Sequence, residues 1–207
     1  MEVEVRYYYS LNEESRLLEK LNTLEELNYL GKFYEKTIQY NHPMRENDFY
    51  SKEIDGRFRV RMTEKDNIKK CMITWKRRLN KTLKNDINKE EEIEVRINSD
   101  DYDNLINILT NILKLKKVES YERFRHVFKN NEVEIVVDIY SFAIALEIEA
   151  KCKNDEYNVI LKWLNKLNLK LEDSYKLSWD DKYSELCKMQ NKEIYSDVLF
   201  DMDMPKL

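Results

Sequence analysis

Charged residues stand at every second position in six short stretches of this 207-residue chain. The first stretch is Glu2-Val3-Glu4-Val5-Arg6 and the last is Glu147-Ile148-Glu149-Ala150-Lys151. Because a β-strand sends alternate side chains to opposite faces, each stretch predicts a strand with one charged face and one apolar face. If these strands form one sheet, carboxylates and cations meet on a common wall. Such a wall would suit a metal ion and a polyanion.

The composition is highly charged but nearly balanced in sign. Charged residues make up 37% of the chain, yet 36 Lys and Arg against 40 Asp and Glu leave a net charge of -4. No overall positive field attracts nucleic acid or a membrane surface, so any anion site must be local and extended nucleic-acid binding is not expected. Gly31 and Gly56 are the only glycines, too few for the glycine-rich phosphate loops of Walker or Rossmann folds.

The length suits a single core, and we predict one domain over residues 1–190 with a C-terminal tail over 191–207. No apolar run approaches the roughly 20 residues that span a bilayer, and the N-terminus opens on an acidic strand instead of a signal peptide. We therefore expect a cytoplasmic protein without membrane contact. Cys71, Cys152 and Cys187 are odd in number and scattered, which argues against a disulfide framework and a zinc site.

Helices are expected at four places between the strands. Leucines at helical spacing predict a helix that begins near Asn12 and ends near Gly31, and an apolar stripe after Ser99 predicts a second. A third is expected to start near Asn154, and a shorter fourth to follow Asp180. The polar, alternating segments between the first two helices predict a run of antiparallel strands.

The acidic stretches contain two E-x-E pairs, Glu2 with Glu4 and Glu147 with Glu149. Each pair places two carboxylates on one face of its strand, and hard divalent cations such as Mg²⁺ and Mn²⁺ prefer these oxygen ligands. Two such strands facing each other would form a metal site. Taken alone, Glu2 and Glu4 are more typical of a solvated edge strand, and it is the second pair that favours the metal site.

The basic stretches place arginine and lysine side chains in rows on single strand faces. Arginine can grip phosphate oxygens through two hydrogen bonds at once, so such rows are suited to a triphosphate. The alternative for the arginines of residues 57–61 is pairing across strands with Glu92 and Glu94, and both interpretations can hold together. The cations in question are Arg57, Arg59, Arg61, Lys76, Arg123 and Arg125.

The order of these segments resembles the CYTH, or triphosphate tunnel metalloenzyme, superfamily. Its E-x-E-x-K strand is matched by Glu2-Val3-Glu4-Val5-Arg6, where Arg6 stands in the place of the lysine. The other matching motifs follow in the family's order over residues 1–187: Phe58-Arg59-Val60-Arg61, Thr74-Trp75-Lys76, Glu92-Ile93-Glu94, Arg123 to Phe128, Asp138 with Glu147-Ile148-Glu149, and Lys182 to Leu186. Each motif alone is weak, and their succession is what favours the family.

The resemblance implies an α+β fold in which an antiparallel eight-stranded sheet closes into a tunnel, a β-barrel with α-helices packed outside. The implied ligands of one or two Mg²⁺ or Mn²⁺ ions are Glu2, Glu4, Asp138, Glu147 and Glu149. The implied triphosphate-binding residues are Arg57, Arg59, Arg61, Lys76, Arg123 and Arg125. Glu2, Glu4 and Arg6 are the implied catalytic residues.

The activity that this resemblance implies is metal-dependent hydrolysis of a small-molecule triphosphate, by a monomer or homodimer. Inorganic triphosphate, thiamine triphosphate and a nucleoside triphosphate are the candidate substrates. Three alternatives stay open: a class IV-like adenylate cyclase that makes cyclic AMP from ATP, an RNA 5′-triphosphatase, and a non-catalytic module that binds phosphorylated ligands. Arg6 keeps the charge of the family lysine but lacks its compact ammonium. This substitution is the reason for retaining the non-catalytic binding module as an alternative.

Overall fold

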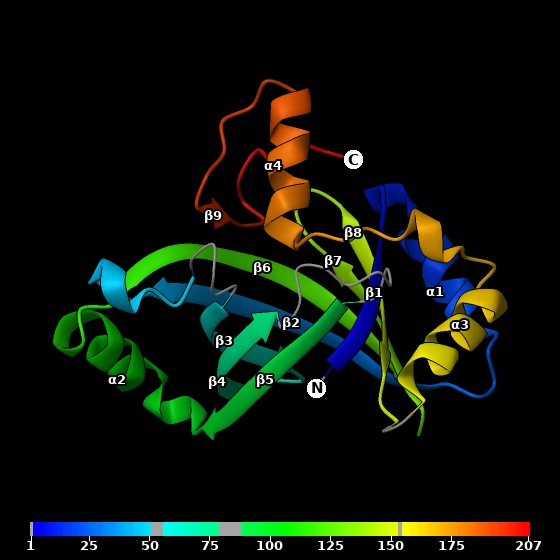
Figure 1. Cartoon of the computed structure of the whole chain (residues 1–207), viewed down its shortest axis with the longest axis horizontal. Coiled ribbons are helices and arrows are strands. Elements are labelled where there is room, and N and C mark those ends of the chain that lie inside the picture. Colours follow the sequence, from blue (N-terminus) through cyan, green and yellow to red (C-terminus); the bar gives the residue numbers. More distant parts are fainter. Residues whose placement is uncertain (1, 51–55, 79–87, 153–154) are drawn as a thin grey trace.

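The computed structural model describes residues 2–50, 56–78, 88–152 and 155–207 (Figure 1). The strands are β1 (Glu2–Tyr9), β2 (Asn28–Asn41), β3 (Gly56–Lys65), β4 (Ile68–Arg78), β5 (Asn88–Ile97), β6 (Lys116–Lys129), β7 (Val133–Ile139), β8 (Ile144–Ala150) and β9 (Asp197–Val198). The helices are α1 (Glu14–Asn22), α2 (Tyr102–Asn107), α3 (Glu156–Lys166) and α4 (Trp179–Met189). The sheet order is β2-β3-β4-β5-β1-β8-β7-β6-β9, and only the short β9 pairs in parallel.

The sheet curls into an open half-barrel. The predicted antiparallel α+β architecture is therefore confirmed, but the predicted closure into a tunnel is wrong. β2 also pairs with β6 over its full length, which bends the sheet back on itself. Within the described residues, β1 and β5 pair from Glu2↔Glu90 to Glu4↔Asn88. A barrel closes where tilt and stagger keep all neighbouring strands in register.

The helices lie where the sequence predicts them, with two corrections of extent. The fourth, expected to be shorter and to follow Asp180, begins at Trp179 and has 11 residues, as many as α3. The N-terminal helix ends at Asn22 and not near Gly31, because Gly31 belongs to β2. Gly31 has a φ of 117°, a left-handed conformation that glycine adopts without strain, and it follows a register shift between β2 and β6. The second predicted helix consists of a short 3₁₀ turn, α2 and a π-helical turn that ends at Ile112.

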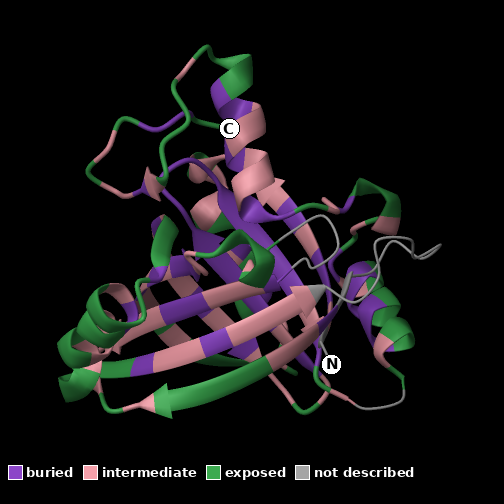
Figure 2. Cartoon of the chain, turned by 60° about the vertical axis from the view of Figure 1, so that its left-hand side comes forward, coloured by how far each residue is buried: buried purple, intermediate pink, exposed green. Residues whose placement is uncertain are grey.

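Helices α1 and α3 both pack on the outer face of β1, β7 and β8 (Figure 1). The apolar stripe of α3, which includes Ile160 and Trp163, meets the outward apolar positions of these strands, such as Ile148. β7 and β8 are consequently buried almost throughout, whereas half of the described residues of β5 are exposed (Figure 2). No helix in the described part of the chain is long and apolar enough to cross a membrane.

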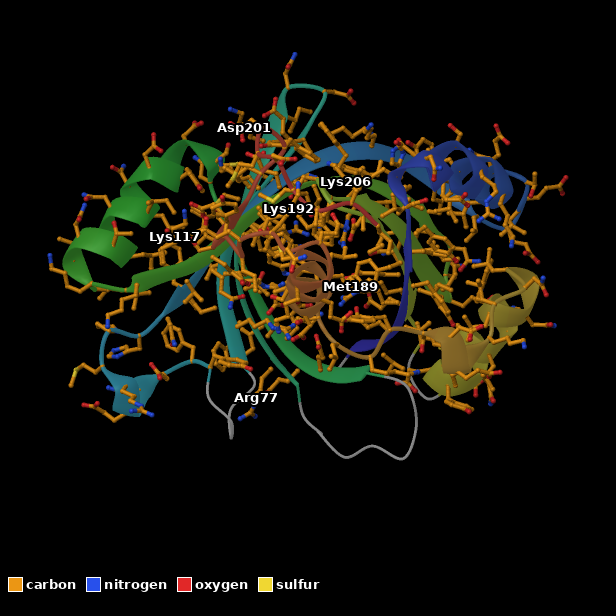
Figure 3. The ribbon with its side chains drawn as sticks, turned by 90° about the horizontal axis from the view of Figure 1, so that it is seen from above. Arg77, Lys117, Met189, Lys192, Asp201 and Lys206 are labelled. Carbon is orange, nitrogen blue, oxygen red and sulfur yellow. The ribbon has the colours of Figure 1, made fainter. Side chains whose placement is uncertain are left out.

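Helix α4 stands over the opening of the curled sheet (Figures 1 and 3). Its start is capped because the Ser178 backbone N–H and hydroxyl both donate to Asp181 Oδ2, at 3.0 and 2.6 Å. Residues 191–207 return along this helix, where β9 pairs with β6 and the side chains of Val198 and Met204 are buried. The predicted division into a domain over 1–190 and a tail over 191–207 stays a prediction.

We expect Ile148→Ala to lower the free energy of unfolding by about 2 to 5 kcal/mol, because it opens a cavity in the core beneath α3. The matched control is Ile93→Ala in β5, where the side chain is 57% exposed and the same truncation should cost about 0.5 kcal/mol or less. Urea unfolding followed by circular dichroism measures both values. Equal costs for the two variants would contradict this assignment of the buried and exposed strands.

Candidate functional site

The concave face of the sheet surrounds a cavity of about 260 Å³ whose wall is almost entirely polar. Among the described residues, the cations that line it are Arg6, Arg57, Arg59, Arg61, Lys76, Arg123, Arg125 and Lys151. The carboxylates that line it are Glu4, Glu90, Glu92, Glu94, Glu134, Glu147 and Glu149. Tyr121, Tyr140, Ser178 and Trp179 complete the wall. The period-two faces of the strands therefore converge on one space.

Most of the site residues predicted from the sequence line this cavity, although their roles stay predictions. Two of them do not belong to this group. Asp138 is fully buried and lies outside the cavity wall. The backbone of Glu2 lies in β1, but its side chain is outside the described residues.

Three carboxylates stand in a row across adjacent strands. In the register of the sheet, Glu149 of β8 is opposite both Glu4 of β1 and Glu134 of β7. Lys151 Nζ lies 2.6 Å from Glu149 Oε1 and 3.7 Å from Glu134 Oε1. The sequence reasoning missed Glu134, although its spacing from Asp138 places both residues on one face of β7 and was the signal available.

Two arginines of β6 are held by buried carboxylates on the neighbouring strands, opposite them in the register. Arg123 Nη1 lies 2.8 Å from Asp138 Oδ2, and Arg123 Nε donates to Glu35 Oε2 at 2.7 Å. Arg125 Nε donates to Asp138 Oδ1 at 2.6 Å, and Arg125 Nη2 lies 3.3 Å from Glu147 Oε2. Asp138 thus serves both arginines at once. Its observed contacts orient cations, whereas its role as a metal ligand is still only predicted.

Glu35 of β2 is a buried carboxylate that the sequence reasoning missed. Burial raises the pKa of Glu35, but Arg123, Arg61 and Arg125 outweigh that effect and hold the pKa well below its usual range. Glu35 is therefore ionised at neutral pH and remains a firm partner for Arg123. A single glutamate in an alternating strand carries no signal that would have distinguished it.

Arg6 lies between two of the predicted metal ligands. Its Nε donates to Glu147 Oε1 at 2.6 Å, and its Nη2 donates to Glu4 Oε1 at 3.2 Å. Its Nη1 donates to the carbonyl oxygen of Leu177, just before α4, at 3.3 Å. Burial lowers the pKa of Arg6, but Glu147, Tyr8 and Glu4 outweigh that effect and raise the pKa well above its usual value. The guanidinium therefore stays charged.

Tyr121 is a buried phenol in the wall, only 1% exposed. Burial raises its pKa, but Arg61, Arg59 and Arg123 outweigh burial, and together with a hydrogen bond to Thr37 they lower the pKa to about 7. The ring centroid of Tyr121 lies 4.4 Å from that of Trp179 at the start of α4. Tyr121 can therefore exchange a proton near neutral pH within the cationic part of the wall. No sequence motif pointed to it.

The donors of the wall suit Mg²⁺ or Mn²⁺ in their chemistry, since carboxylate oxygens are the ligands that these ions prefer. Within the described residues, no three acidic, histidine or cysteine side chains are grouped closely enough to hold an ion by themselves. Mg²⁺ is commonly bound by one or two carboxylates, with substrate phosphates and waters completing its shell. The side chains therefore fit an ion that is bound together with a phosphate ligand.

We expect Asp138→Asn to lower the free energy of unfolding by about 3 to 5 kcal/mol, because the buried guanidinium of Arg123 and the partly buried one of Arg125 lose the charge that balances them. The matched control is Glu91→Gln, whose partner Arg77 points outward from the end of β4 (Figure 3). Both members of that pair are more than 40% exposed, so its loss should cost about 1 kcal/mol or less. Urea unfolding at neutral pH compares them; similar costs would refute the buried network.

We expect one of the 14 tyrosines to ionise near pH 7, and Tyr121→Phe to remove that transition. Because the folded pKa lies below the ordinary value of 10, the phenolate stabilises the fold fully above pH 10 and loses this contribution as the pH falls through 7. Absorbance at 295 nm measures the ionisation. Tyr157→Phe, at an exposed position, should keep the transition, and its persistence in Tyr121→Phe would contradict the assignment.

No protein-family model and no curated protein matches this sequence, but solved structures share its fold. The PH1012 protein of Pyrococcus horikoshii has a TM-score of 0.65 at 22% identity, over 86% of this chain and 97% of that one. A candidate adenylate cyclase of Vibrio parahaemolyticus has a TM-score of 0.61 at 14% identity, over 88% and 97%. HpAC1 of Hippeastrum, a candidate adenylyl cyclase stated to reveal a dominant triphosphatase activity, has 0.59 at 16%, over 93% and 97%. At 14 to 22% identity these likenesses show a shared fold, and membership of the CYTH superfamily stays a prediction.

Proposed function

We propose that this chain hydrolyses a triphosphate bound in the cavity, with inorganic triphosphate, thiamine triphosphate or a nucleoside triphosphate as the substrate. The observation that carries the proposal is the cavity itself, a polar space of about 260 Å³ lined by guanidinium and ammonium groups from β1, β3, β4 and β6 and by Lys151 just after β8. Phosphoryl transfer depends mainly on positioning and on stabilising charge, which such a wall supplies. The triphosphatase activity stated for the Hippeastrum neighbour supports the same reaction.

The arginines of β3 supply the groups best placed to bind phosphate. Arg59 is 8% exposed and lines the cavity, with its Nη2 at 4.0 Å from Glu92 Oε1. Within the described residues, the buried Nε of Arg59 has no hydrogen-bond partner. An unsatisfied buried donor costs about 1 to 3 kcal/mol, and a phosphate oxygen that accepts from it would recover this cost. This supports Arg59 as a phosphate ligand.

The charge of the described wall supports a divalent cation as part of the bound state. The eight cations and seven carboxylates give 8 − 7 = +1, whereas a triphosphate carries about four negative charges near neutral pH. Mg²⁺ or Mn²⁺ would be held by Glu149 and Glu4, which are opposite each other in the register, and by phosphate oxygens. When bound, the ion would neutralise phosphate charge and polarise the terminal phosphoryl group.

The proposed reaction is in-line attack of water on the terminal phosphorus. A bond forms from the water oxygen, the bond to the bridging oxygen breaks, and orthophosphate and the shortened phosphate chain are released. A carboxylate of the wall accepts the proton of the attacking water. Arg59, Arg61 and Lys76 would stabilise the charge that develops on the phosphoryl oxygens.

Two other functions have an observation in their favour. Two neighbours are candidate adenylate cyclases, which supports a reaction in which the ribose 3′ hydroxyl of ATP replaces water. The wall carboxylates already contact arginine and lysine, which supports a module that binds phosphates without turnover. An RNA 5′-triphosphatase stays a further alternative, without a specific observation.

The deciding experiment incubates the protein with Mg²⁺ or Mn²⁺ and, separately, with inorganic triphosphate, thiamine triphosphate, ATP and triphosphate-ended RNA. Orthophosphate release is the expected result. Formation of cyclic AMP and pyrophosphate from ATP would show that the protein is a cyclase and not a hydrolase. Tight triphosphate binding without any product would support the non-catalytic binding module. If the protein shows neither binding nor turnover, the proposed site is wrong.

In the same assay we expect Arg59→Gln to raise KM for the hydrolysed triphosphate by about 10-fold or more, because one charge-assisted contact is lost. The matched control is Arg77→Gln, the same substitution at the end of the neighbouring strand but outside the cavity wall. Its kinetic constants should be those of the unmodified chain. Equal KM values for the two variants would exclude Arg59 from the phosphate site.

A further inference from the structure

Arg6 holds the position that lies between Glu4 and Glu147, both of which line the cavity. The guanidinium uses different nitrogens for the two carboxylates, Nη2 for Glu4 and Nε for Glu147. Its third nitrogen, Nη1, donates to the Leu177 carbonyl in the segment before α4. The backbone of Arg6 is tied to the same segment, since its carbonyl accepts from the Tyr175 N–H at 2.7 Å.

These contacts fix the guanidinium in a way that an ammonium at this position could not reproduce. A guanidinium directs its N–H groups in a planar fork and can satisfy several acceptors at once, whereas an ammonium is a compact point charge. Both oxygens of Glu147 are also engaged, Oε1 by Arg6 Nε and Oε2 by Arg125 Nη2. A metal ion that bound Glu4 and Glu147 together would have to displace Arg6 from both of them.

We infer that Arg6 is a built-in cation that excludes a divalent ion from the position between Glu4 and Glu147. This inference rests on the proposed function, which places the metal and phosphate site in this cavity. The chain then binds a single divalent ion, on the side of Glu149, and the charge of a second ion is supplied by the guanidinium. Glu149 contacts Lys151, whose single ammonium is easier to displace than a guanidinium anchored on three sides.

The test measures Mn²⁺ binding by the full chain without any phosphate ligand, by isothermal titration and by the electron paramagnetic resonance of free Mn²⁺. We expect Arg6→Ser to bind Mn²⁺ at least about 10-fold more tightly than the unmodified chain, because two carboxylates lose their resident cation. Mn²⁺ should also raise the melting temperature of Arg6→Ser more than that of the unmodified chain. If Arg6 only formed a structural salt bridge, Arg6→Ser would lose stability and Mn²⁺ would not restore it.

Two further variants decide whether the new site is the one inferred. In Arg6→Ser combined with Glu147→Gln, the gain in Mn²⁺ affinity should disappear, because one of its ligands is removed. Arg77→Ser, which breaks an exposed pair with Glu91 outside the cavity, should leave Mn²⁺ affinity unchanged. If Arg6→Ser fails to fold, Arg6→Lys is tested in its place. Its Mn²⁺ affinity should be higher than that of the unmodified chain, and lower than that expected for a site without any resident cation.

The inference is overturned if the unmodified chain binds Mn²⁺ as tightly as Arg6→Ser or Arg6→Lys, or if the double variant keeps the gain. These results do not depend on catalysis, because no triphosphate is present. A chain that fails to hydrolyse triphosphates but gains Mn²⁺ affinity on loss of Arg6 would refute the proposed function and leave this inference standing. A chain that hydrolyses triphosphates but gains no Mn²⁺ affinity on loss of Arg6 would refute this inference and leave the proposed function standing.

Discussion

Buried ion pairs run across four neighbouring strands and connect them into one unit. Asp138 of β7 binds the arginines of β6, Arg125 reaches Glu147 of β8, and Glu147 binds Arg6 of β1. A buried charge without its partner costs several kcal/mol, so each of these groups requires its neighbours to be in place. Strand register and charge pairing therefore depend on each other, because a slip of one residue would turn every charge toward the apolar side.

The same network sets how the cavity is covered. Arg6 holds the carboxylates of the wall on one side and the Leu177 carbonyl on the other, so the segment that leads into α4 is fixed by a residue of the site. Tyr121 makes a similar connection, because it is surrounded by arginines on the sheet and packs on Trp179 at the start of α4. The cover is thus attached to the wall through groups that also face the ligand space.

Period-two alternation was sufficient to predict that the arginines of one strand share a face, because that property depends only on the strand. Arg57, Arg59 and Arg61 illustrate this, since all three line the cavity. The alternation could not predict that Asp138 is buried out of reach of the cavity, because depth is set by the residues on neighbouring strands. It also could not foresee that the sheet stays an open half-barrel, since closure depends on the tilt and stagger of strands far apart in sequence. Tyr121 was missed because its low pKa arises from arginines on other strands.

The near balance of charge in the wall bears on which ligand the proposed site would select. An orthophosphate brings too little charge to separate cations from carboxylates that already pair with them, such as Lys76 and Glu90 at 2.8 Å. A triphosphate can engage several cations at once, and the ion that accompanies it can compensate the carboxylates left behind. Selection for a longer phosphate chain would then come from the existing pairs, which act as competitors that only a multivalent ligand displaces.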